Sequence, residues 1–222
     1  EQKIPLNKID FFYVPGNYEW QKNILKLFGI TEQKMINSET YRHLKAKNLI
    51  AIDHPWYQKG FIQNEVAILP EWIIFWLREK FLNLSKKFDC SDRVFIDRSE
   101  SIFNHCKIIN NEEIIKYLSS FGFKSYQVGK LDFFEQIYLF NNAKIIIGPH
   151  GAAFTNIVFS NPDLNLVEII PDNHPSKKCK RICSLLKINY TRIETPKIIN
   201  KKISGDMYIS VKEIEEVLNR FL

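Results

Sequence analysis

The segment from residue 143 to residue 171, AKIIIGPHGAAFTNIVFSNPDLNLVEIIP, constrains the fold more than any other part of the chain. It predicts a buried strand over residues 143–147, a turn of small residues carrying one imidazole, a short helix over about 152–159 and a second buried strand over 166–170. Short aliphatic runs bounded by Gly or Pro are typical of parallel strands that are covered on both faces. The segment therefore predicts half of an α/β unit with a parallel sheet.

The turn GPHGA, residues 148–152, follows the first of these strands. Ligands of parallel sheets bind beyond the carboxyl ends of the strands. Glycines there let a ligand approach the backbone, and the first N–H groups of the next helix face an anion. His150 would lie beside a phosphate as a donor or partial cation. Glu168, an acid in an apolar strand, would accept hydrogen bonds from ribose hydroxyls, and its burial requires a partner.

These residues resemble a known family. GPHGAAFTNIVF followed by LVEIIP is similar to the signature of glycosyltransferase family 61, and the similarity extends upstream through RVFIDR, IINNEEIIKYLSSFGF and LDFFEQIYLFNNAKIII. It covers residues 93–171 well and the first ninety residues loosely. The resemblance implies an inverting transferase that uses a nucleotide sugar, and the expected donor is a UDP-sugar. It also implies two Rossmann-like domains in the GT-B arrangement, with the donor held by the carboxyl-terminal one.

A set of basic, small and polar residues is predicted to bind this donor. Arg98 ends a strand predicted over residues 93–97, where a guanidinium can grip a diphosphate with two parallel hydrogen bonds. A salt bridge with Asp97 or Glu100 is the structural alternative. For Asn156 the alternatives are a contact with the phosphate or nucleoside and a bond to the local backbone. The predicted donor-binding residues are Arg98, Lys107, Gly148, His150, Gly151, Ala152, Asn156 and Glu168, with Lys177 and Lys178 adding positive potential at the rim.

The transfer also requires a general base that takes the proton of the acceptor hydroxyl. Asp53 and His54 are candidates because they follow a predicted strand, and His150 is a third candidate. The resemblance implies a reaction without a bound metal or other cofactor, in agreement with the lack of an Asp-x-Asp pair. Cys179 and Cys183 share a helical face near His174, and buried thiols are favoured there over a zinc site.

The chain is predicted to be α/β from its first residues, with a smaller amino-terminal α/β domain over residues 1–90 on the acceptor side. Strands are expected over 9–14, 35–37 and 48–52, and helices over 18–28 and 71–82. A boundary at 90–92 leads to the Rossmann-like donor domain over 91–222. Ninety residues are few for a complete Rossmann-like domain. The first domain is therefore either a compact variant or incomplete, and in the second case the chain would bind donor without transferring.

The charge and composition of the chain limit the classes of partner that we expect. The net charge is +6, but the basic residues are dispersed, and no basic run with interleaved aromatic residues predicts nucleic-acid binding. No apolar run reaches the roughly 20 residues of a membrane span. The expected partners are a nucleotide sugar and a glycan acceptor; the alternative is a nucleotide-sugar- or carbohydrate-binding module without turnover. Richness in Ile, Lys and Asn is typical of an AT-rich genome and hence of a microbial or viral source. An enzyme from such a source is expected to act in the cytoplasm, whereas a eukaryotic relative would act in the secretory lumen.

Overall fold

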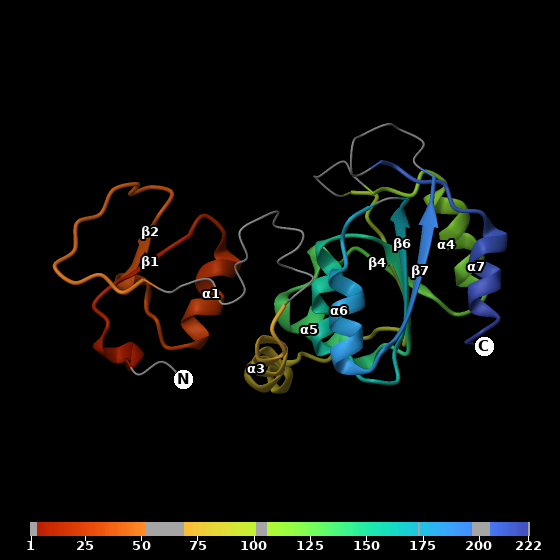
Figure 1. The fold of residues 1–222 in the computed structure, drawn as a ribbon. Helices are drawn as coiled ribbons and strands as arrows, with labels where there is room; N and C mark the ends of the chain where they lie inside the picture. The colour runs from red at the N-terminus through yellow and green to blue at the C-terminus, as the bar shows by residue number, and fades with distance from the viewer. Residues whose placement is uncertain (1–3, 52–68, 101–105, 173, 197–204, 222) are drawn as a thin grey trace. The chain divides into compact units, whose positions relative to one another are not determined.

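The computed structural model describes residues 4–51, 69–100, 106–172, 174–196 and 205–221 (Figure 1). The chain forms two compact units, residues 1–53 and 54–222, each of which is described by itself. This division differs from the boundary predicted at residues 90–92. The reason is helix α3 (Glu71–Phe81), which packs against the later part of the chain and so belongs to the second unit. Its Arg78 Nη1 donates to Val158 O at 2.6 Å and to Ser160 O at 2.8 Å.

The first unit is a small parallel βαβ element. Strand β1 (Phe12–Val14) leads into helix α1 (Glu19–Leu27) and then into strand β2 (Met35–Asn37), which pairs with β1 in parallel. The strand predicted over residues 48–52 is wrong for residues 48–51, which form no strand and leave Leu49 80% exposed. Without a partner strand or a core to cover it, a short apolar run has no reason to adopt the extended ladder.

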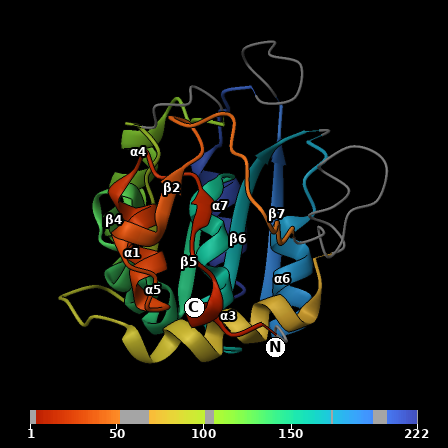
Figure 2. The same cartoon turned by 90° about the vertical axis from the view of Figure 1, so that its left-hand side faces the viewer.

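The second unit contains a five-stranded parallel sheet in the order β4-β3-β5-β6-β7. In Figure 2 the labels β4, β5, β6 and β7 of this sheet follow one another across the view in that order. Every neighbouring pair is parallel, which confirms the parallel α/β sheet expected from the alternating strands and helices. The strands are β3 (Arg93–Ile96), β4 (Lys124–Tyr126), β5 (Ile145–Pro149), β6 (Asn165–Pro171) and β7 (Asn189–Thr195).

Helices cover both faces of this sheet, as Figure 1 shows. Alternate strand residues, including Phe95, Ile147 and Val167, face a core that also contains residues of α4 and α7. The other face packs under α5, α6 and the 3-10 helix η5. Burial on both faces explains the nearly continuous aliphatic sequence of β5 and β6. The helices are α4 (Asn111–Ser119), α5 (Phe133–Asn142), η5 (Ala152–Phe159), α6 (Lys178–Leu186) and α7 (Val211–Leu218).

Local signals place these helices. Asp132 caps α5 by accepting the N–H of Glu135 at 2.9 Å, and the Glu135 side chain returns a bond to the Asp132 N–H. Ser210 and Glu213 form the same capping box at the start of α7. Each box pairs N–H groups that the first helical turn would otherwise leave unsatisfied. The segment predicted as a helix at about 152–159 has the expected range and is a 3-10 helix.

Candidate functional site

The carboxyl ends of β3 and β5 form the topological switch point of the sheet. From β3 the chain crosses to β4 on one side, and it then returns to β5 on the other side of β3. Ligands of open α/β sheets bind in the crevice outside such a point. Arg98 follows β3, and the turn with His150 and Gly151 follows β5. The fold therefore brings together two groups that the sequence analysis assigned to the donor.

Close packing explains both glycines of this turn. A Cβ on Gly148 would lie 2.8 Å from Ile96 Cβ and 3.0 Å from the Ile96 carbonyl oxygen. A Cβ on Gly151 would lie 1.6 Å from Arg98 Nη1 and 2.5 Å from its Cζ. The sequence analysis expected these glycines to make room for a ligand. In the structure the space at Gly148 is filled by Ile96 and the space at Gly151 by the guanidinium of Arg98, so the glycines bring Arg98 against the turn.

Three cationic side chains gather at this end of the sheet. Burial lowers the pKa of Arg98, but a guanidinium remains charged in a protein. Lys178 Nζ donates to the Gly151 carbonyl at 3.1 Å and to Thr155 Oγ1 at 3.2 Å, so it lies on the same turn. Lys107 Nζ donates to the carbonyl of Ser99, the residue after Arg98, at 3.0 Å. This arrangement of positive charge suits a bound diphosphate.

The two acids offered as alternative partners of Arg98 are bound elsewhere. Asp97 accepts hydrogen bonds from the Ser99 N–H at 2.9 Å and from the side-chain amides of Asn111 and Gln127 at 2.9 and 3.0 Å. Desolvation opposes ionisation of Asp97, but these bonds hold the pKa of its carboxyl below the usual value. Glu100 forms an ion pair with Lys130 at 2.6 Å. The Asp97 network thus fixes the chain where Arg98 leaves β3.

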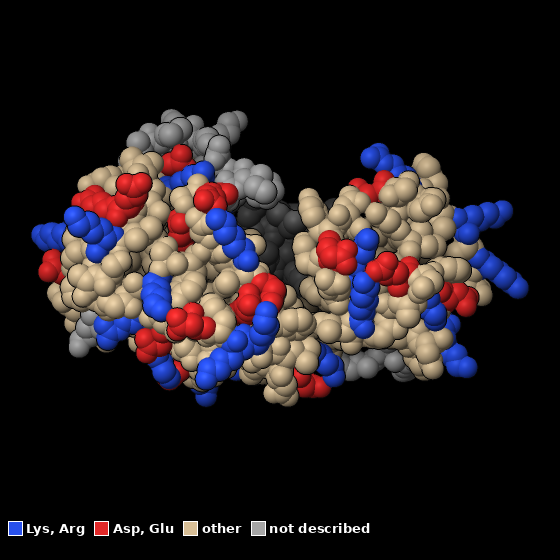
Figure 3. Space-filling model, turned by 180° about the vertical axis from the view of Figure 1, so that it is seen from behind, with Lys and Arg blue, Asp and Glu red and all other residues tan. Residues whose placement is uncertain are grey.

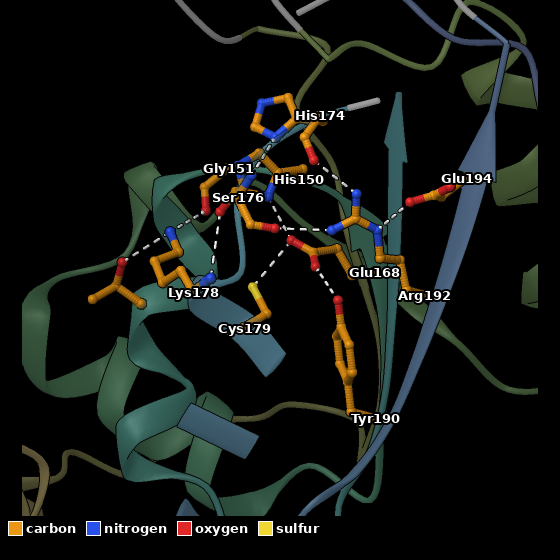
Figure 4. Close-up of polar contacts among 11 residues, drawn as sticks. His150, Gly151, Glu168, His174, Ser176, Lys178, Cys179, Tyr190, Arg192 and Glu194 are labelled. Atoms are coloured by element: carbon orange, nitrogen blue, oxygen red, sulfur yellow. Dashed lines mark hydrogen bonds and ion pairs between the residues drawn. The ribbon is translucent and has the colours of Figure 1, made fainter. Parts of the chain in front are cut away.

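His150 is held by a buried carboxylate (Figure 4). Its Nδ1 lies 2.5 Å from Glu168 Oε1, and Glu168 itself is 1% exposed. The same carboxylate accepts a bond from Cys179 Sγ at 3.0 Å and one from the Tyr190 hydroxyl at 2.6 Å. The sequence analysis assigned Glu168 to ribose hydroxyls and required a partner for it. The partners are these three side chains, and through the first of them Glu168 supports His150.

The loop after β6 is held in place by hydrogen bonds from Arg192 on β7. Arg192 donates to the carbonyls of Ser176 at 2.8 Å and His174 at 2.9 Å, and it forms an ion pair with Glu194 at 2.8 Å. The ring of His174 lies against that of His150, with 4.5 Å between centroids. Arg192 therefore places a second imidazole beside the first, as Figure 4 shows.

His150, Glu168 and Cys179 are also residue types that bind metals, and their ligand atoms lie within 4.8 Å of one another. Two ligands of a tetrahedral zinc ion would be about 3.3 Å apart, given bond lengths near 2.0–2.1 Å. The 2.5 Å between His150 Nδ1 and Glu168 Oε1 is shorter than this and fits a direct hydrogen bond. We therefore assign the cluster to hydrogen bonding. Cys183 is buried on the same helix, in keeping with the prediction of buried thiols.

The remaining candidates are placed as follows. Asn156 Nδ2 donates to Gln136 Oε1 at 2.9 Å, so its amide nitrogen joins η5 to α5 through a side chain and not through the local backbone. Ala152 begins η5 at the turn and is exposed. Asp53 and His54, the first two candidates for the general base, lie outside the described residues.

Sequence reasoning missed Tyr190, Arg192 and the bond from Cys179 to Glu168. Tyr190 and Arg192 alternate along β7, and Arg192 is in register with Glu168 on β6. Polar residues at every second position of a strand beside a buried acid are the signal that could have found them, because side chains at period two share a face.

The model of the family described as Glycosyltransferase 61 matches residues 9–167, which is more than half of the chain. The chain belongs to glycosyltransferase family 61. The family 61 match includes Arg98, the turn at His150 and most of both units, and it ends one residue before Glu168. No curated protein matches the chain closely enough to add a relative.

The surface of this family 61 chain carries mixed charge. On the face shown in Figure 3, Lys and Arg side chains are interspersed with Asp and Glu and form no continuous basic patch. In the described part of the chain, no helix is both long and apolar enough to cross a membrane. The cations at the switch point, Arg98, Lys107 and Lys178, are a local charge feature that suits an anionic ligand.

Proposed function

We propose that this chain transfers a sugar, a hexose or pentose, from a UDP-sugar to a hydroxyl of a glycan with inversion at the anomeric carbon. The observation that carries the proposal is the guanidinium of Arg98 packed on Gly151 at the switch point of the sheet. Lys178 reaches the same residue through its carbonyl oxygen. Membership of family 61 supports a glycosyltransferase, and these cations support a diphosphate as the part of the donor that is held.

The proposed step forms one bond and breaks one. The acceptor hydroxyl oxygen bonds to the anomeric carbon while the bond from that carbon to the β-phosphate oxygen breaks. The electron pair of the broken bond stays on the phosphate, and Arg98, Lys178 and Lys107 stabilise the charge that develops there. These fixed cations support a reaction that proceeds without a bound metal, which we retain as part of the proposal.

His150 belongs to the leaving-group side in this scheme. It is the neighbour of Gly151, so a protonated Nε2 would donate to the phosphate that departs. In an inverting displacement the hydroxyl attacks the opposite face of the sugar, so the base comes from another part of the protein. Asp53 and His54 remain our candidates for that base, with the first unit on the acceptor side of a GT-B arrangement. Cytoplasmic synthesis of a polysaccharide is the setting we propose.

Nucleotide binding tests the donor site. We expect calorimetric titration to show binding of UDP in preference to GDP, CMP and NAD, and Arg98→Ala to weaken UDP binding at least tenfold. Arg93→Ala is the matched control, because Arg93 lies at the amino end of the same strand, where Nη1 donates to Phe121 O at 2.6 Å. Equal UDP affinity in Arg98→Ala and wild type would refute the assignment.

Turnover separates the transferase from a binding module. Release of UDP from a panel of UDP-sugars, measured with glycan acceptors, is expected to depend on both donor and acceptor. Tight UDP binding with no release across the panel would favour the module instead.

A further inference from the structure

Glu168 is an ionisable group that the fold has buried and then surrounded with donors. It lies in β6 between aliphatic neighbours and is 1% exposed. Burying a carboxylate without partners is strongly unfavourable. Here Oε1 accepts from His150 and Cys179, and Oε2 accepts from Tyr190. A carboxylate with this many donors is favoured in its ionised form.

The protonation states of its neighbours follow. Desolvation opposes ionisation of Glu168, but the bond and charge of His150, together with the bonds from Tyr190 and Cys179, hold the pKa of Glu168 below its usual value. Burial, with the nearby Glu168 charge, raises the pKa of Tyr190 and of Cys179, so both keep their protons and donate. The proton between Glu168 and His150 therefore lies on Nδ1.

The second ring nitrogen of His150, Nε2, remains available to a ligand. Nε2 of His150 has no hydrogen-bond partner within the described residues. It is not buried, so solvent reaches it. The His150 side chain keeps 11% of its surface exposed. A histidine held through Nδ1–H by a buried acid has Nε2 as its acceptor nitrogen while the ring is neutral, and Nε2 donates to an anion once it takes up a proton.

The surroundings of the ring carry charge from several elements. Arg98 and Lys178 lie against Gly151, the next residue, and the His174 ring packs on His150. Arg192 holds the loop that carries His174. Each of these groups is positive or neutral, so Glu168 is the counter-charge in contact with His150.

We propose that Tyr190 and Cys179 are positioning residues for the transfer: their hydroxyl and thiol fix the carboxylate of Glu168 so that it holds Nδ1–H of His150. Nε2 is then the nitrogen that takes up a proton and donates to the phosphate of the donor. The proposal rests on the proposed function for its role in the reaction, and on the hydrogen bonds alone for its structural part. Both residues lie beyond the range matched by the family model.

The chain offers matched control variants. Cys179 and Cys183 are both buried on one face of α6, but the bond to Glu168 comes from Cys179. Cys179→Ala removes a donor, Cys179→Ser retains one, and Cys183→Ala makes a comparable cavity without touching the carboxylate. Tyr126→Phe is the control for Tyr190→Phe, since the Tyr126 hydroxyl is also hydrogen-bonded, to the Ser91 N–H at 2.8 Å, on the opposite edge of the sheet.

The first measurement is the tautomer of His150 in the nucleotide-free protein. Imidazole nitrogen and carbon-bound proton correlations at mildly alkaline pH distinguish a proton on Nδ1 from one on Nε2, and comparison with His150→Ala assigns the signal. We expect wild type, Cys183→Ala, Tyr126→Phe and Cys179→Ser to show the Nδ1–H form. In Tyr190→Phe and Cys179→Ala we expect a mixture of the two tautomers. A mixture in wild type, or an unchanged Nδ1–H form in both of these variants, would overturn the proposal.

The second measurement is UDP affinity by calorimetry. Tyr190→Phe and Cys179→Ala are expected to bind UDP about three- to tenfold more weakly, a change on the scale of one hydrogen bond, and Cys179→Ser to restore most of the loss. If Tyr190→Phe shows a mixture of His150 tautomers but binds UDP as tightly as wild type, the positioning role in the reaction is refuted. Because the tautomer is read without nucleotide, a failure of UDP binding in wild type would refute the proposed function while leaving the hydrogen-bond network tested on its own.

Discussion

Replacing Gly151 with alanine tests the packing of Arg98 directly. The new Cβ would lie 1.6 Å from Arg98 Nη1, whereas non-bonded atoms settle at about 3.5–4.0 Å. The guanidinium must therefore move by about 2 Å. Gly151 has extended backbone with φ at 175°, which alanine adopts without strain, so the whole effect comes from the displaced side chain.

The displacement separates binding from stability. A hydrogen bond with a charged partner contributes roughly 1.5–3 kcal/mol, so loss of one such contact lowers UDP affinity roughly 10- to 100-fold. Only the far end of a flexible side chain moves, so we expect the free energy of unfolding to change by less than about 1 kcal/mol. Calorimetry with UDP gives the first quantity and urea unfolding gives the second.

Gly129→Ala is the matched control, since a Cβ at Gly129 meets nothing within 4 Å. It should leave both quantities unchanged. A folded Gly151→Ala protein that binds UDP as tightly as wild type would show that the position of Arg98 against the turn is irrelevant to the ligand, and the reasoning would fail.

Three further predictions concern stability. Gly148→Ala places a Cβ 2.8 Å from Ile96 Cβ and 3.0 Å from the Ile96 backbone oxygen, so β3 and β5 must shift and urea unfolding should show a loss of about 1–3 kcal/mol; an unchanged midpoint would contradict the packing. Glu168→Gln leaves the three donors to this side chain poorly paired and should lower the free energy of unfolding by about 1–3 kcal/mol. Because the folded pKa of Glu168 lies below 4.5, its contribution is present above pH 4.5 and is lost as the pH falls through the folded value, so the difference from wild type in the free energy of unfolding should shrink in acid. A difference that grows in acid would reverse our assignment of charge. Asp132→Ala removes the cap of α5 and should lower the free energy of unfolding by about 1 kcal/mol without changing UDP affinity, which unfolding and calorimetry on the same sample can check.

Local pattern predicted the parts of the fold that local physics governs. The aliphatic runs before Gly148 and around Val167 became buried parallel strands, and the Asp132 and Ser210 caps began helices. The strand expected over residues 48–52 failed for its described residues because an apolar run without a partner is not a strand. The boundary predicted near residue 90 differs from the division after residue 53. The apolar sequence of α3 predicts a buried helix but does not say which unit covers it, and contacts such as Arg78 with Val158 place it in the second unit.

By itself the sequence determined that Arg98 and the His150 turn would both follow strands of a parallel sheet, because strand direction and the position after a strand are read from the order of the chain. Only the tertiary structure decided which groups these residues meet. Glu168 binds Tyr190, 22 residues away on the next strand, and Cys179, 11 residues away on a helix. The reason is geometric: strand register and helix packing set such contacts to within an ångström, and no local period of the sequence encodes them.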